Sequence, residues 1–209
     1  MIIEITGVDG SGKSTLINIL RRKINENGLY CAYERNFKSN TLVFLENISL
    51  MRGKRTATET FNAELIEFAK AVELVQEINK NFFYLNKDAK QIYFVDKYYS
   101  ELMVKLSYQK PEVQEQLKLI YNYLPKPQLS FLINVSTNEI VRRLEARDKG
   151  DRLLYFPNYK EQLDKLRTEH IQISKHLPYN QYIIDGERHP EDIVGEIFHI
   201  INEFLSKTL

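Results

Sequence analysis

The chain has 209 residues, of which 43% are apolar and 27% charged, so its composition is that of a globular protein with enough apolar side chains for a substantial core. Its formal net charge of +1, without a basic tail or a run of like charges, argues against nucleic acid or an anionic membrane as the main partner. Cys31 is the only cysteine, so no intrachain disulfide can form, and no apolar run reaches the roughly 18 residues of a membrane-spanning helix. With no basic leader, the chain is expected to be soluble and cytoplasmic.

Short apolar runs alternate with stretches of helical periodicity along the chain. The first half predicts, in order, a strand at 2–6, a helix ending at Asn27-Gly28, a strand at 29–33 continuing to 36, a helix at 42–51 and a helix at about 60–85. A strand at 92–95 then delivers Asp96, and two helical stretches divided by Pro111 lead to Pro125-Lys126-Pro127. The remainder predicts a strand at 129–135, a helix capped by Thr137, a charged segment at 148–157, a helix at 158–176, a strand at 181–184 and a helix from Pro190.

This alternation predicts an α/β fold. Each predicted strand is short and apolar on both faces, which is typical of a parallel sheet covered by helices. The long helix carries apolar residues at helical spacing, namely Leu65, Phe68, Val72, Val75, Ile78 and Phe82. Neither an internal repeat nor a linker is visible. We therefore expect a three-layer fold with a five-stranded parallel sheet and helices on both faces, in a single domain spanning 1–209.

The stretch Gly7 to Thr15 fits the pattern G-x-x-x-x-G-K-[ST] between a predicted strand and a predicted helix. This is the P-loop of nucleotide triphosphate-binding proteins, whose backbone N–H groups and helix N-terminus face phosphates. The chance match of a plain turn is the alternative, and the full spacing and flanks count against it. We expect the triphosphate to be held by Gly7, Asp9, Gly10, Ser11, Gly12, Lys13, Ser14 and Thr15. Lys13 would reach the β- and γ-phosphates, and the Ser14 hydroxyl would hold Mg²⁺.

Two charged residues follow predicted strands. In open α/β sheets, ligands bind beyond the carboxyl ends of the strands, so Asp96 is expected to meet the P-loop magnesium and take part in catalysis. Arg35, at the end of the second strand, can grip an acceptor phosphate with its planar guanidinium. The alternatives are that Asp96 is a solvated acid at a strand end and that Arg35 is a surface arginine in a loop.

A cluster of arginines follows the fourth strand. The segment from Arg142 to Arg152 contains four arginines and one lysine at a helix end and in the loop after it. A lid at about 147–157 could close over the phosphates, with Arg147 and Arg152 on the transferring phosphoryl group and Arg143 on the nucleotide. A solvated basic helix end is the alternative.

The histidines and the turn after the last predicted strand say less about function. The histidines His170, His176, His189 and His199 lack metal-ligand spacing and are expected at the surface or at helix ends. The segment Asp185-Gly186-Glu187-Arg188 is predicted as a turn at the ligand edge of the sheet.

The P-loop classes differ in their other motifs. The chain has no Asn-Lys-x-Asp guanine-reading motif after a strand, since Asn86-Lys87-Asp88-Ala89 places the acid one residue early, and Tyr99 stands where a GTPase has glycine. ABC-type and helicase-type ATPases carry their own signatures and longer chains. A small kinase with an arginine-rich lid fits best.

Over nearly its whole length the chain resembles the thymidylate kinase family of nucleoside monophosphate kinases. The resemblance rests on Ile5 to Thr15, on Glu34-Arg35, on Asp96-Lys97-Tyr98, on Ala146-Arg147 through Asp151-Arg152, and on Asp185-Gly186. It implies transfer of the ATP γ-phosphoryl group to dTMP with Mg²⁺, usually by a homodimer. It further implies that Asp9 holds the acceptor sugar, that Arg35 contacts the acceptor phosphate, and that Phe68, Lys97 and Tyr98 contribute to the acceptor site.

The chain departs from the family mainly in its acceptor motifs. Lys97 replaces the arginine of Asp-Arg-Tyr, Asn36-Phe37 replaces a proline and glycines, and Phe68 to Glu73 lacks the family's base-reading arginine. The leading prediction is an ATP-dependent nucleoside monophosphate kinase acting on dTMP. The alternatives are a kinase of the same fold for another small-molecule acceptor and a non-catalytic ATP-binding protein.

Overall fold

The computed structural model describes residues 1–35, 39–85, 91–96, 98–147 and 152–208. The chain divides into two compact units. Unit 1 comprises Met1–Arg35, Lys90–Val104 and Lys126–Leu209, and unit 2 comprises Asn36–Ala89 and Lys105–Pro125. The single domain expected over 1–209 stays a prediction.

Unit 1 contains a parallel sheet, which confirms the predicted α/β class. Its strands are ordered β2 (Tyr30–Arg35), β3 (Gln91–Asp96), β1 (Ile2–Thr6), β4 (Leu129–Asn134) and β5 (Gln181–Asp185). Each neighbouring pair is parallel. The central strand β1 is flanked by β3 and β4, so the loop after β1 starts at the middle of the carboxyl edge.

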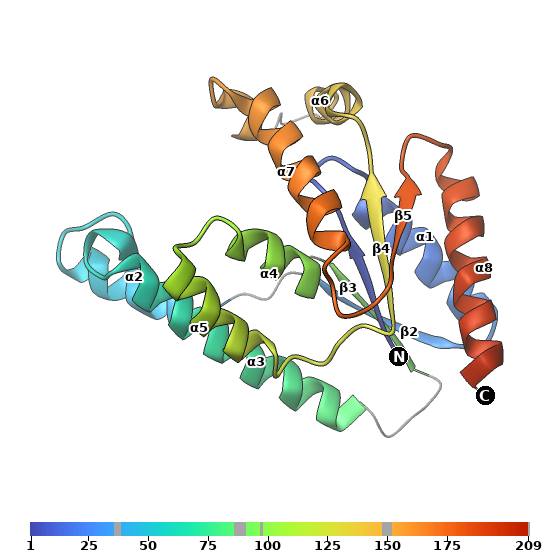
Figure 1. Cartoon of the computed structure of the whole chain (residues 1–209), viewed down its shortest axis with the longest axis horizontal. Helices are drawn as coiled ribbons and strands as arrows, with labels where there is room; N and C mark the ends of the chain where they lie inside the picture. The colour runs from blue at the N-terminus through green and yellow to red at the C-terminus, as the bar shows by residue number, and fades with distance from the viewer. Residues whose placement is uncertain (36–38, 86–90, 97, 148–151, 209) are drawn as a thin grey trace. The chain divides into compact units, whose positions relative to one another are not determined.

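Helices of unit 1 cover the sheet. They are α1 (Lys13–Glu26), α4 (Tyr99–Leu106, which begins in this unit), α6 (Thr137–Glu145), α7 (Tyr159–Ser174) and α8 (Pro190–Thr208), with a short 3-10 turn, η2, at Arg152–Tyr155. Figure 1 shows α1 and α8 on one side of the sheet and α7 on the other.

The core of unit 1 follows from strand alternation. Successive side chains of a strand point to opposite faces, so Ile3 and Ile5 share a face of β1 and Glu4 points the other way. Both isoleucines are fully buried in one apolar cluster with residues of α1 and α8, among them Ile17, Leu20, Val194 and Ile197. The buried residues of α8, Ile193, Val194, Ile197 and Ile201, recur at helical spacing and form its apolar stripe.

Unit 2 consists of helices in the residues that the structure describes. These are α2 (Asn40–Met51), η1 (Ala57–Glu59), α3 (Ala63–Leu85) and α5 (Pro111–Tyr121). The predicted apolar face of the long helix is partly wrong, because Leu65 is 55% exposed and Val72 is 43% exposed. Ile66 and Ala71 are buried instead, since α3 packs against α5 and α2 through another face.

Two further details differ from the sequence-based expectations. The fifth strand is not apolar on two buried faces: Tyr182 and Ile183 are exposed, because β5 is an edge strand of the sheet. The helix α6 is capped by Ser136 rather than by Thr137, since the Ser136 Oγ accepts a hydrogen bond from the Glu139 N–H at 3.4 Å.

Candidate active site

The turn between β1 and α1 is built around glycines with positive φ angles. Gly7, Gly10 and Gly12 have φ values of 141°, 90° and 94°. At Gly7, a Cβ atom would lie 2.6 Å from the backbone oxygen of Ile133 in β4, a separation that no side chain tolerates. Gly12 takes the left-handed conformation at the N-cap of α1, where the chain turns from loop to helix. This curled backbone suits a phosphate at the helix N-terminus.

Lys13, the first residue of α1, folds back over this loop. Its side chain is only 5% exposed, and the Nζ atom donates hydrogen bonds to the carbonyl oxygens of Gly7 at 2.8 Å and Val8 at 3.1 Å. Asp9 Oδ1 lies 4.0 Å from the same nitrogen. The loop thus satisfies a buried ammonium group and fixes its positive charge where an anion would be stabilised.

The hydroxyl groups of the loop complete a set of donors that fits a triphosphate. Ser11 is buried, and its Oγ has no hydrogen-bond partner in the described part of the chain. Such a buried hydroxyl is costly unless a ligand or water pairs with it. Ser14 is half-buried in the first turn of α1, and Thr15 is exposed.

A magnesium ion also fits, provided that the substrate completes its coordination. Among the described residues, no three His, Cys, Asp or Glu side chains lie close enough together to hold a metal ion. Ser14 and Asp96 offer one hydroxyl and one carboxylate. Mg²⁺ usually keeps several waters and binds through one or two carboxylates and substrate phosphates, so this small donor set is suitable.

Sheet register places Asp96 next to the strand that leads into the loop. Asp96 is the last residue of β3, pairs with Ile5 of β1 on one side and with Arg35 of β2 on the other, and is buried. Two of the predicted site residues, Asp96 and Arg35, therefore share the carboxyl edge of the sheet with the glycine-rich loop. The Arg35 side chain lies outside the described part of the structure.

Arg143 of α6 links three elements around the loop. Its Nη1 donates to the Ser11 carbonyl at 3.2 Å, its Nη2 to the Gly186 carbonyl at 2.9 Å, and its Nε to Glu139 Oε1 at 2.7 Å. The guanidinium thus joins the loop after β1 to the turn after β5. A planar fork of N–H donors suits this bridging role better than an ammonium group does.

Replacing Arg143 by alanine is expected to lower kcat/KM for the nucleotide donor roughly tenfold or more, because two carbonyl oxygens beside the donor site lose their partner. Arg142 is the matched control, since its side chain is exposed and forms its ion pair with Glu139 of the same helix. Steady-state kinetics of Arg143→Ala and Arg142→Ala check this. Equal losses of kcat/KM in both variants would show that the positive charge of α6 supports activity and that the contacts of Arg143 do not.

Glu139 organises the arginines of α6. It accepts hydrogen bonds from Arg142 and Arg143 at 2.7 Å, and these hold the pKa of its carboxyl well below the ordinary value, at about 2. The spacings i,i+3 and i,i+4 on one helix are a signal in the sequence from which this network could be predicted.

This depressed pKa predicts a pH dependence of stability. A carboxyl whose pKa is lower in the folded than in the unfolded chain stabilises the fold above the unfolded value of 4.5, and this contribution is lost as the pH falls towards about 2. The difference in Tm between the native chain and Glu139→Gln should therefore be largest above pH 5 and shrink towards pH 3. A difference independent of pH would contradict the prediction. Thermal melts over this range measure it.

The structure describes the predicted lid and acceptor residues only in part. Lys97 and residues 148–151 lie outside the described residues, as does the side chain of Arg152. Arg147 is exposed just after α6, and Tyr98 is buried, with burial as the main cause of its raised pKa. Phe68 lies on α3 in unit 2, and its predicted acceptor contact stays a prediction.

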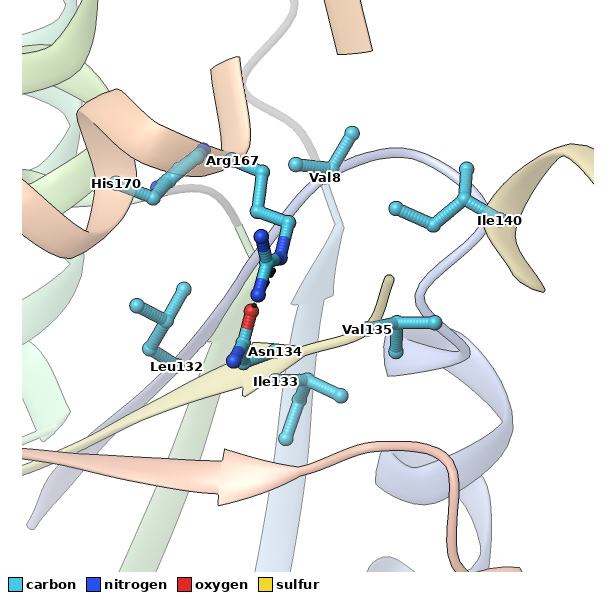
Figure 2. A pocket seen from close by; sticks show the side chains of 8 residues that line it. All are labelled: Val8, Leu132, Ile133, Asn134, Val135, Ile140, Arg167 and His170. Atoms are coloured by element: carbon cyan, nitrogen blue, oxygen red, sulfur yellow. Dashed lines mark hydrogen bonds between the residues drawn. The ribbon is translucent and has the colours of Figure 1, made fainter. Parts of the chain in front are cut away.

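A small pocket lies beside the loop, on the side of α7. Figure 2 shows it, and its volume is about 10 Å³, which is room for about one water molecule. Arg167 of α7 reaches into it and donates from Nε to Asn134 Oδ1 at 2.8 Å. His170 also lines it and is buried, 3.3 Å from Glu101 Oε2, so the surface or helix-end position expected for this histidine is wrong.

A family model described as "Thymidylate kinase" matches residues 5–197. "Probable thymidylate kinase 1" of Saccharolobus solfataricus is 28% identical over 210 residues, with 98% of each chain covered. "Thymidylate kinase" of Orientia tsutsugamushi is 28% identical over 221 residues, covering 99% of this chain and 95% of the relative.

Solved structures with a similar fold include deoxyadenosine kinase from M. mycoides, described with the products dCMP and a flexible dCDP bound, which superposes with a TM-score of 0.60 at 19% identity. The match covers 97% of this chain and 100% of that chain. At this identity the likeness concerns the fold alone. No helix among the described residues is long and apolar enough to cross a membrane.

Proposed function

This chain belongs to the thymidylate kinase family, whose reaction is the ATP-dependent phosphorylation of dTMP to dTDP, and we propose that its glycine-rich loop and the carboxyl edge of its sheet carry out that reaction. The observation that carries the proposal is the pairing of Ile5 with Asp96, which brings a carboxylate beside the loop that buries Lys13. The fold we propose is accordingly the three-layer P-loop kinase fold.

On the donor side, Lys13 would exchange its loop carbonyl partners for the β- and γ-phosphates. The loop N–H groups, the Ser11 hydroxyl and the N-terminus of α1 would bind the remaining phosphate oxygens. A Mg²⁺ ion held by Ser14 and Asp96 would supply charge neutralisation at the phosphates. The contribution of the protein is positioning and electrostatic stabilisation, without a covalent nucleophile.

On the acceptor side, Arg35 would orient the phosphate of dTMP next to Asp96, and Asp9 would hold the sugar. Asp9 supports this role by its position, since its side chain is 54% exposed on the loop that carries the donor site. Lys97, Tyr98 and Phe68 are the remaining acceptor candidates. Arg147 and Arg152 are proposed to stabilise the transferring group, and Arg143 to shape the nucleotide site.

A homodimer is the proposed assembly. Unit 2 exposes apolar side chains at heptad spacing on α2, where Val43 is followed by Leu50 and Phe44 by Met51, and likewise on α3 with Leu65 and Val72. Exposed apolar patches of this kind mark interaction surfaces, and a symmetric dimer is the commonest solution. Light scattering should give twice the mass of one chain. The proposed compartment is the cytoplasm, where the buried thiol of Cys31 would stay reduced.

The acceptor is tested by incubating the protein with Mg-ATP and a panel of nucleoside monophosphates and measuring ADP. ADP formation with dTMP, and much less with dCMP, dUMP, AMP and GMP, is expected. Turnover with another phosphorylated or hydroxylated small molecule but with none of the panel would favour a different acceptor. Tight ATP binding without any turnover would favour a non-catalytic protein.

A further inference from the structure

Glu4 is a buried carboxylate that takes no part in the phosphoryl transfer proposed for this chain. It lies in the middle of the central strand β1, on the face opposite to Ile3 and Ile5, and its exposure is 0%. An unpaired charge at such a place would be prohibitive, so its partners decide why it is there.

The Glu4 carboxylate is surrounded by hydrogen-bond donors. Oε1 accepts from the Ser100 N–H and from the Ser100 hydroxyl, both at 2.9 Å. Oε2 accepts from the Ser130 hydroxyl at 2.8 Å and from the Tyr179 hydroxyl at 2.9 Å. Gln181 Nε2 donates to the Ser130 oxygen at 2.8 Å, which leaves the Ser130 proton for Glu4. Burial raises the pKa of the Glu4 carboxyl, and the hydrogen bonds from Ser130, Ser100 and Tyr179 act in the opposite direction. Two donors at each oxygen suit the ionised form, which only accepts.

These donors belong to different parts of unit 1. Ser130 lies in β4, and Tyr179 precedes β5, so both belong to the sheet and its connections. Ser100 is different, because it is the second residue of α4 and its N–H is one of the unpaired donors of a helix N-terminus. Glu4 therefore caps α4 from another strand, with its negative charge at the positive end of the helix.

The position of α4 matters for the site. Asp96 ends β3, and only Lys97 and Tyr98 separate it from the first residue of α4. Glu4 lies on the strand that enters the glycine-rich loop at Gly7. One carboxylate therefore connects the strand that delivers the donor loop with the helix that directly follows the acceptor candidate Tyr98.

We propose that Glu4 is a positioning residue for the acceptor side: by capping α4 it fixes Tyr98, which directly precedes that helix, relative to the donor loop. This inference rests on the proposed function, because it assigns Tyr98 to the acceptor site. The donor loop depends less on Glu4, since β1 is held by backbone ladders with β3 and β4 on both sides.

The test compares variants that remove one donor from each side of the carboxylate. Ser100→Ala removes a hydroxyl donor on α4, and Tyr179→Phe removes a hydroxyl donor elsewhere while keeping the ring that packs edge-on against Tyr99 at 5.9 Å. Glu4→Gln replaces the acceptor-only carboxylate by an amide that must turn an N–H₂ towards donors. For each variant, KM for dTMP, KM for ATP, kcat and Tm are measured.

We expect Glu4→Gln and Ser100→Ala to raise KM for dTMP roughly fivefold or more, with KM for ATP within about twofold of the native value. Tyr179→Phe should lower Tm by a similar amount to Ser100→Ala and leave KM for dTMP within about twofold. If Tyr179→Phe raises KM for dTMP as much as Ser100→Ala does, or if both KM values rise together, Glu4 is only a stabilising core group and the inference is wrong. If Glu4→Gln does not fold, the comparison of Ser100→Ala with Tyr179→Phe tests the inference by itself.

The activity of the native chain distinguishes a failure of the proposed function from a failure of the role proposed for Glu4. A native protein that phosphorylates dTMP, with variants whose KM for dTMP is unchanged, overturns the role of Glu4 only. A native protein that binds Mg-ATP but does not phosphorylate dTMP overturns the proposed function, and this inference with it.

Discussion

Replacing Lys13 by methionine should reduce kcat for the phosphorylation of dTMP by roughly 10²- to 10³-fold or more. The Lys13 ammonium is buried in the loop and bound to the Gly7 and Val8 carbonyl oxygens, so its charge is already in place before the γ-phosphoryl group is transferred. In a poorly solvated site this charge counts for more than it would in water. Methionine keeps the apolar stem of the side chain and removes only the charged group.

The control for this variant is Arg22→Ala, which removes a cation from an exposed position on the same helix. Its kcat should stay within about twofold of the native value. Circular dichroism and thermal melts establish that both variants fold. A folded Lys13→Met protein with native kcat would show that the loop is not part of the catalytic site.

The second large effect is on stability. Gly7→Ala should lower the free energy of unfolding by about 3 kcal/mol or more, because two costs combine at this position. The φ angle of 141° is one that side chains avoid, and the added methyl group would meet the Ile133 carbonyl oxygen at 2.6 Å. That oxygen belongs to the backbone of β4 and cannot move aside as a flexible side chain would. Urea denaturation of the two proteins gives the difference.

Gly28→Ala separates the two causes. Gly28 also has a positive φ, of 77°, but a methyl group added there would meet nothing within 4 Å, so only the backbone cost of about 1 kcal/mol remains. Equal destabilisation at both glycines would mean that the loop relaxes away from β4 without cost. Such a loop would be less rigid than its close approach to Ile133 indicates.

Features carried by a few neighbouring residues could be predicted from the sequence. The glycine-rich loop is one, because its glycines, its lysine and the flanking strand and helix all lie between Ile2 and Glu26 and obey local rules. The strand ending at Asp96 is another, because a short apolar run before an acid is visible by itself. The parallel sheet follows from the alternation of such runs with helices.

Features that depend on residues far apart in the chain could not be predicted from the sequence. The apolar spacing of α3 predicts its helical state but not the side on which α2 and α5 pack, so the predicted face that includes Leu65 and Val72 is partly wrong. The buried position of Glu4 depends on Ser130 and Tyr179, whose donors come from much later in the sequence. His170 is buried for the same reason, since its partner Glu101 lies on α4.

The transfer of the γ-phosphoryl group of ATP to dTMP is tested most directly by following the label from γ-³²P-ATP with the native chain, Mg²⁺ and dTMP. The label should appear in the β-position of dTDP, one mole for each mole of ADP formed, and should be lost with Lys13→Met. Label released only as inorganic phosphate, or no transfer to dTMP while ATP is bound tightly, would contradict the assignment of this chain as a dTMP kinase.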